Sequence, residues 1–222
     1  MILLQAPFLN LQALLDGVMV GSIFALVAYG MALVWGVMNI INVAQGEYVI
    51  FGGYITFGIY KLGVSPIYGM PFSFLFLFIL GYILYRLIVF RVVDKDMFIS
   101  ILATFGISIM IQQFMNMFFG SQVETALTGL GTIFFFDGNI TIALVKVFSF
   151  VISILGAIAV IYFMRVSKLG RAIRATAQNP RAARILGVDT EKVYAYTYAI
   201  NAGLCGLAGS LVAMTYTLHP YI

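Results

Sequence analysis

Between residues 72 and 84 the chain reads Phe72-Ser-Phe-Leu-Phe-Leu-Phe-Ile-Leu-Gly-Tyr-Ile-Leu84. Strands of a membrane β-barrel alternate polar and apolar residues over about ten positions, and this stretch does not alternate. It lies within an apolar segment from residue 66 to 90, which exceeds the roughly 20 residues that an α-helix needs to cross a hydrocarbon core of about 30 Å. The stretch therefore predicts a transmembrane helix.

Further apolar segments flank this one and predict an all-α, polytopic transmembrane helix bundle of about six spans, in a single domain over residues 1–222. The segments run from residue 11 to 37, 46 to 62, 66 to 90, 97 to 119, 140 to 165 and 193 to 218. The composition agrees, because 63% of the residues are hydrophobic and 9% are charged, whereas about a quarter are charged in soluble domains. The first segment has no basic start that would mark a cleaved signal peptide.

Positive charge is concentrated in two joints between apolar segments. These joints contain Arg86, Arg91 and Lys95, and Arg165, Lys168, Arg171, Arg174, Arg181, Arg184 and Lys192. Lysine and arginine in short loops mark the cytoplasmic side, so the net charge of +4 indicates topology rather than a nucleic-acid-binding surface. The joint at residues 120–139 has Glu124 and Asp137 but no basic residue, and it is predicted to lie outside. Counting back places the N-terminus outside, unless a re-entrant break near residues 39–46 changes the number of crossings.

The longest polar segment, residues 165–192, carries its own helix signals. Asn179 can cap a short helix that begins at Pro180, because the asparagine side chain accepts from free amides and proline has no amide to leave unpaired. Gly187 can end that helix. Its apolar residues are Ala182, Ala183, Ile185 and Leu186. A helix this short is not stable alone, so residues 166–192 are expected either to dock on a partner protein or to form a basic loop that meets lipid headgroups.

A resemblance favours docking. The pattern Ala182-Ala183-x-x-x-Gly187 resembles the loop by which ABC importer permeases engage their ATPases, and Gly170-Arg-Ala-Ile-Arg-Ala-x-Ala-Gln-Asn-Pro-x-Ala-Ala-x-x-Leu-Gly-Val188 resembles the branched-chain amino acid permease family. The likeness continues in order at residues 21–30, 36–47, 103–108 and 202–209. It implies that the coupling residues are Gly170, Arg171, Arg174, Asn179, Pro180, Ala182, Ala183 and Gly187.

The same resemblance implies partners. They are a sister permease, two cytoplasmic ATPases and an extracytoplasmic solute-binding protein, in a bacterial inner membrane, with ATP used by the partners and no cofactor or metal held by this chain. The chain departs from the family at Gln45, where a histidine is usual, so a role that depends on histidine protonation is lost. Similar proteins continue with further helices beyond Pro220, so the expectation is either a chain truncated at Ile222 or a sequence given without its last part.

Two groups of polar residues are candidates for a translocation path. The first is Asn39, Asn42, Gln45 and Glu47, and the second is Gln112 and Asn116, which lie on one helical face. Polar groups are costly in lipid and should face protein or water. The first group is expected to line the path or to form an ordinary cytoplasmic turn, and the second to bind solute or to join neighbouring helices.

Other residues are assigned to packing or to the membrane boundary. The small residues at Gly17 and Gly21, Ala199 and Gly203, and Ala202 and Gly206 predict close helix packing within the chain, with a dimer seam as the alternative. Asp16 and Lys146 are expected to snorkel from span ends, Asn201 to pair inside the membrane, and Cys205 to pack without other function.

The motifs of competing functions are missing from the sequence. It has no phosphate-binding Gly-x-x-x-x-Gly-Lys-[Ser/Thr] loop, no His-Glu-x-x-His metal motif and no Gly-x-Ser-x-Gly nucleophile turn. The prediction is a non-catalytic permease of an ABC importer for branched-chain amino acids. A urea or short-amide permease of the same family, a secondary carrier or channel, and a membrane enzyme remain as alternatives.

Overall fold

The computed structural model describes residues 7–218 except residues 94, 121–124, 127 and 136–139. Glu124 and Asp137, on which the predicted side of the 120–139 joint depends, lie outside the described residues, as does Pro220. The helices are α1 (Pro7–Met38), α2 (Gln45–Lys61), α3 (Gly69–Leu87), α4 (Met97–Phe119), α5 (Leu144–Val166), α6 (Lys168–Gln178), α7 (Pro180–Ile185) and α8 (Thr190–Thr215), with short 3-10 turns at Pro66–Tyr68 and Val89–Arg91.

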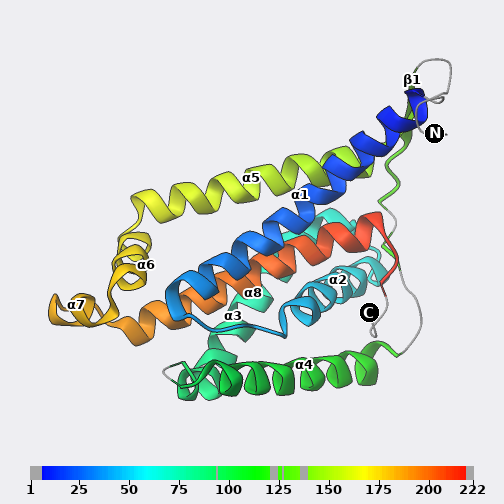
Figure 1. The fold of residues 1–222 in the computed structure, drawn as a ribbon. Helices are drawn as coiled ribbons and strands as arrows, with labels where there is room; N and C mark the ends of the chain where they lie inside the picture. Colours follow the sequence, from blue (N-terminus) through cyan, green and yellow to red (C-terminus); the bar gives the residue numbers. More distant parts are fainter. Residues whose placement is uncertain (1–6, 94, 121–124, 127, 136–139, 219–222) are drawn as a thin grey trace.

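The central element of the bundle is α8, whose residues are buried almost throughout its length. It packs against α1, α2 and α3, while α5 and α4 lie further out (Figure 1). Small residues make these contacts close, since added methyl groups at Gly206 and Gly209 would meet the backbones of α3 and α2. The internal packing predicted at Ala202 and Gly206 is therefore present. At Gly17 and Gly21 it is absent, because nothing lies within 4 Å of a methyl group added there.

Each of the six predicted segments contains a long helix, and the helix-bundle prediction is confirmed. The predicted start of the fifth span at residue 140 is wrong, because residues 140–143 form a strand and α5 begins at Leu144. Among the described residues, five helical segments are long and apolar enough to cross a membrane, and these contain α1, α3, α4, α5 and α8. The sixth, α2, has 17 residues and follows a non-helical stretch at residues 39–44. A two-stranded antiparallel sheet of β1 (Thr132–Phe135) and β2 (Ile140–Ala143), which was not predicted from the sequence, lies in the joint between α4 and α5.

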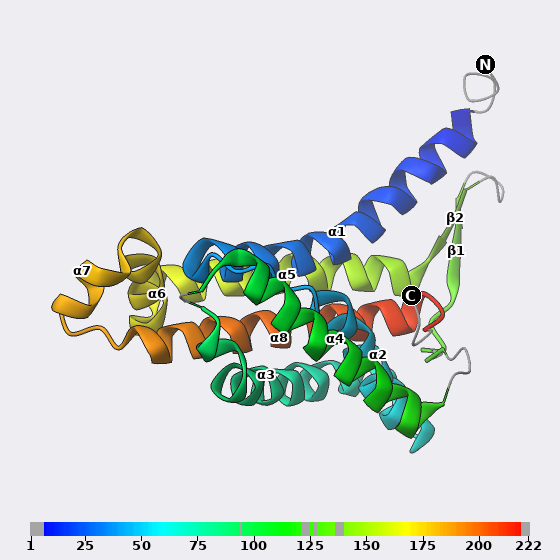
Figure 2. The same ribbon diagram turned by 60° about the horizontal axis from the view of Figure 1, so that its bottom comes forward.

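The two basic joints lie at the same end of the bundle, which we call the basic end. The last turn of α1 forms one cavity with Lys95 and with Pro180, so the ends of α1, of the 89–95 joint and of α6 meet there. The β-sheet and the first turns of α1 lie at the other end, the hairpin end (Figure 2). This arrangement agrees with both basic joints facing one side and the first turns of α1 facing the other. Which side is cytoplasmic stays a prediction.

The stretch at residues 39–44 carries the chain part of the way back through the bundle before α2 begins (Figure 1). The helix α2 runs parallel to α8, because Gln45 meets Asn201 and Thr56 meets Ser210. Asn201 lies 11 residues after the first residue of α8, so α2 starts about 16 Å along that helix. The break therefore runs from the exposed Asn39 at the basic end to the buried start of α2, so a turn confined to the end of the bundle does not describe it.

Candidate functional site

The segment from α6 to the start of α8 is a folded element at the basic end. Asn179 Oδ1 accepts a hydrogen bond from the Ala182 amide at 3.0 Å, Pro180 is the first residue of α7, and Gly187 has a φ of +85°. These are the three helix signals predicted from the sequence. Ser167 was not predicted from the sequence; its Oγ accepts from the Gly170 amide at 2.8 Å and caps α6.

A close elbow joins α5 to α6. A methyl group added at Gly170 would lie 2.5 Å from the Met164 carbonyl oxygen, so only glycine permits this approach. Arg171 Nη1 donates to the carbonyl of Val166 at 2.7 Å and holds the same elbow. Of the residues predicted for coupling, Gly170 and Arg171 therefore shape the elbow, and the side chains of Arg171 and Arg174 are both exposed.

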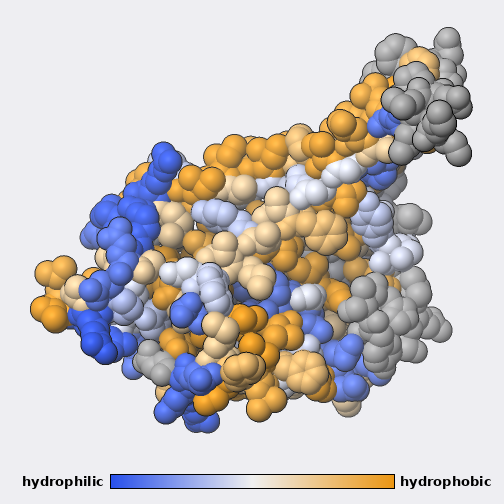
Figure 3. All heavy atoms as spheres, in the orientation of Figure 1, coloured by the Kyte–Doolittle hydropathy of each residue, from blue (hydrophilic) through white to orange (hydrophobic). Residues whose placement is uncertain are grey.

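The apolar residues of α7 divide between two faces. Ala183 is buried against the bundle, but Ile185 and Leu186 are 86% and 83% exposed. Figure 3 shows hydrophobic atoms at the tip of α7 beyond the hydrophilic band over α6. Large apolar side chains on a short, well-capped helix outside the predicted membrane region are typical of a surface that another protein covers.

The element is fixed to α8 by two polar contacts. Arg184 Nε donates to Thr190 Oγ1 at 2.6 Å. Asp189 caps α8 by accepting from the Lys192 amide and forms an ion pair with the Lys192 ammonium at 2.9 Å. These hydrogen bonds hold the pKa of the Asp189 carboxyl below its ordinary value. The α7 tip is thus presented on a backbone that is held at both ends.

A second constellation surrounds the start of α2. Gln45 and Asn201 form a reciprocal amide pair, in which each side-chain nitrogen donates to the other side-chain oxygen at 2.9 Å. Gln45 Nε2 also donates to the carbonyl of Val27 at 3.1 Å, and Cys205 Sγ lies 3.0 Å from the same nitrogen. Side chains from α2 and α8 and a carbonyl from α1 are therefore joined in the interior, and Asn201 pairs as predicted.

The network continues toward the basic end. Asn42 Nδ2 donates to Gln45 Oε1 at 3.4 Å, Tyr198 OH donates to Asn42 Oδ1 at 3.3 Å, and the hydroxyls of Tyr48 and Tyr198 lie 3.0 Å apart. All of these side chains are buried. Their polar atoms bind one another, which is how a polar group becomes tolerable inside a membrane protein.

The residues predicted to line the translocation path differ in burial and in the helix on which they lie. Asn42 and Gln45 belong to the buried network, whereas Asn39 is exposed at the basic end with a φ of +53°. Glu47 is partly buried in the first turn of α2. The hydrogen bonds around Gln45 come from α1, α2 and α8, while Gln112 and Asn116 lie on another helix, α4, one turn apart as predicted.

Thr104 of α4 holds the non-helical stretch and was not identified from the sequence. Its Oγ1 accepts from the Val43 amide at 3.1 Å and lies 3.0 Å from the Ile41 carbonyl, toward which it can donate. Backbone groups outside a helix need such partners inside a membrane. The only sequence signal was that Thr104 lies within the 103–108 stretch that resembles the permease family.

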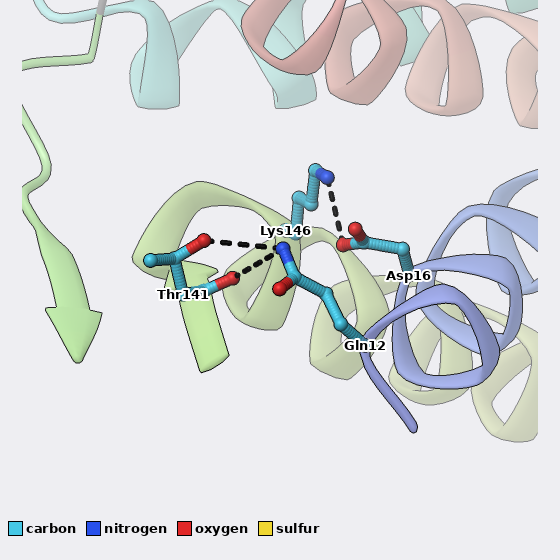
Figure 4. A network of polar contacts seen from close by, with 4 residues as sticks. All are labelled: Gln12, Asp16, Thr141 and Lys146. Atoms are coloured by element: carbon cyan, nitrogen blue, oxygen red, sulfur yellow. Dashed lines mark hydrogen bonds and ion pairs between the residues drawn. The ribbon is translucent and has the colours of Figure 1, made fainter. Parts of the chain in front are cut away.

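Polar side chains also join α1 to β2 and to α5 near the hairpin end. Lys146 Nζ lies 2.7 Å from Asp16 Oδ1, and Gln12 Nε2 donates to Thr141 Oγ1 at 3.1 Å (Figure 4). Asp16 and Lys146, which are expected to snorkel from span ends, thus pair with each other, and both side chains are partly exposed. The pair replaces two isolated charges near the membrane with one neutralised contact.

Comparison with known proteins identifies the family. The family described as "Branched-chain amino acid transport system / permease component" matches residues 13–221. The chain belongs to this family. Residues 166–192 and the network at Gln45 both lie within the matched region. Because the family consists of permease components, this permease is a multi-pass membrane protein and a subunit of an ABC-type importer.

Three relatives of this permease are proteins of amino acid transport systems. The LivH permease protein of a high-affinity branched-chain amino acid transport system in Salmonella typhimurium is 29% identical, over 96% of this chain and 73% of its own length. Its Escherichia coli K12 counterpart is 28% identical over the same shares. The BraD permease protein of Pseudomonas aeruginosa is 29% identical, over 96% of this chain and 74% of its own. No solved structure matches the chain.

Proposed function

We propose that this permease carries branched-chain amino acids across a bacterial inner membrane as one of two membrane subunits. A solute-binding protein delivers the amino acid at the hairpin end, and two ATPases act at the basic end. Support for the substrate comes from the three relatives, which are permease proteins of branched-chain amino acid transport systems. No cofactor is assigned to this chain, because ATP is used by the partner subunits.

The observation that carries the proposal is the exposed apolar tip of α7. Ile185 and Leu186 project from a basic, capped element whose elbow is continuous with a long membrane helix, α5. An ATPase that covers this tip can push on the bundle through the elbow, which is the kind of domain movement that alternating access requires. A carrier or channel has no use for a second protein at this position.

The test is to replace Leu186 with aspartate. Because Leu186 is 83% exposed, the bundle should fold normally, while a buried charge at the contact should abolish co-purification of the ATPase and leucine uptake in proteoliposomes. The matched control is Leu62→Asp, since Leu62 is 80% exposed beyond α2, at the hairpin end.

Two results would contradict the proposal. One is normal ATPase binding and uptake by Leu186→Asp. The other is uptake of labelled urea but not of labelled leucine by the complete wild-type complex, which would assign the permease to short amides.

A further inference from the structure

A cavity of about 590 Å³ lies between α1, α2 and the segment that follows α8. Its walls include Val20, Ile23, Val27, Gly46, Val49 and Ile50. Apolar pockets of this size are typical of small-ligand sites, in which a few polar groups set the orientation. The walls of this cavity are almost entirely aliphatic, so they suit a hydrocarbon group and offer nothing to a charge.

The two ends of the cavity differ. Toward the basic end, Val27 and Gly46 line it, and the bond from Gln45 Nε2 to the Val27 carbonyl joins α1 to α2 at that point. Gln45 and Asn201 are turned toward each other and satisfy each other's amides. At the hairpin end the cavity is lined by Tyr216 and Thr217, which are both exposed.

We propose that this cavity receives the aliphatic side chain of the transported amino acid, and that the ammonium and carboxylate stay at the mouth beside Tyr216 and Thr217. The inference rests on the proposed function. Burial of a free ammonium or carboxylate against aliphatic walls would be costly, so the zwitterionic end remains where water and hydroxyls are available. Val27 and Gly46 line the opposite end, where the hydrogen bond from Gln45 to the Val27 carbonyl holds α1 against α2.

The cavity selects by size and branching rather than by hydrogen bonds. Each added or removed methylene in an aliphatic pocket changes discrimination by about 10-fold or more. A leucine or valine side chain therefore gains contacts that an alanine side chain does not make. Small polar solutes such as urea gain nothing from these walls.

The test compares two tryptophan substitutions on α1. Val20 lines the cavity, whereas Val18 on the same helix is 52% exposed and is not among its lining residues. With the assembled complex of permeases, ATPases and binding protein in proteoliposomes, Val20→Trp should lower labelled leucine uptake at least about 10-fold. Val18→Trp should transport normally, and both variants should still bind the ATPase.

A second variant covers the case in which Val20→Trp fails to assemble. Val49→Leu narrows the cavity by one carbon and should lower the ratio of leucine to alanine uptake about 10-fold. Normal leucine uptake by Val20→Trp, or an unchanged ratio in Val49→Leu, would overturn the proposal and assign the cavity to a lipid acyl chain. If the wild-type complex itself transports no branched-chain amino acid, the proposed function fails instead.

Discussion

Replacing Asn201 with alanine tests whether the reciprocal amide pair fastens the start of α2 to α8. The substitution removes both 2.9 Å hydrogen bonds between Asn201 and Gln45. An interhelical hydrogen bond in a membrane protein contributes about 0.6 kcal/mol on average and about 2 kcal/mol at most. Because Gln45 keeps its bond to the Val27 carbonyl, we expect Asn201→Ala to lower the free energy of unfolding by about 1 to 2 kcal/mol.

Gln45→Ala should lower the free energy of unfolding by more than Asn201→Ala does. Gln45→Ala removes the same two bonds and also the bond to Val27, and it leaves the amide of Asn201, which is 0% exposed, without its partner. A buried polar group that loses its partner adds about 1 to 3 kcal/mol. We therefore expect a loss of about 3 kcal/mol for Gln45→Ala.

A double-mutant cycle measures the interaction energy between Gln45 and Asn201. Unfolding in mixed detergent and dodecyl sulfate micelles, followed by circular dichroism, gives the free energies, and the double variant should lose about 1 kcal/mol less than the sum of the single losses. Thr197→Ala combined with Gln45→Ala is the control, because the Thr197 hydroxyl donates only within its own helix, to the Val193 carbonyl. Additivity within about 0.5 kcal/mol for Gln45 and Asn201 would refute the reasoning.

Three further changes test other contacts. Thr104→Val should speed amide hydrogen exchange in residues 41–43 and lower the free energy of unfolding by about 1 to 2 kcal/mol. Thr104→Ser keeps the hydroxyl and should do neither. Equal exchange in both variants would show that the hydroxyl does not hold residues 41–43. Gly209→Ala should prevent folding because its methyl group would overlap the backbone of α2, whereas Gly21→Ala, with nothing within 4 Å, should fold normally in the same expression assay. Lys146→Met should lower the free energy of unfolding by about 1 kcal/mol. The double variant Asp16→Lys with Lys146→Asp should keep the wild-type free energy of unfolding, because it forms the same ion pair with its charges exchanged. A loss in neither variant would show that the ion pair contributes nothing.

Features that depend on neighbours along the chain could be predicted from the sequence. Apolar segments of membrane-spanning length located all the long helices, and the order asparagine, proline, glycine at residues 179, 180 and 187 located α7. These features follow from local rules, because a helix satisfies its own backbone groups and its caps lie within a few residues.

Features that depend on distant residues could not be predicted in the same way. The depth of the break before α2 is set by Gln45 and Asn201, which are 156 positions apart. Nothing local indicates that a threonine on α4 holds residues 41–43, or that Asp16 and Lys146, 130 positions apart, face each other. The division of α7 into a buried Ala183 and an exposed Ile185 and Leu186 likewise depends on where the bundle lies.

The elbow at Gly170 has a mechanical consequence. Because α6 touches the backbone of Met164 and is capped by Ser167, a force on α6 has little slack to take up before it reaches α5. The 23 residues of α5 make a rod of about 34 Å, so each tilt of about 10° at the elbow carries its far end through about 6 Å. That far end is tied to α1 through the ion pair of Lys146 and Asp16. One end of α5 is therefore moved by α6 and the other is held by α1, so the distance that α5 can travel is limited by how far α1 can follow.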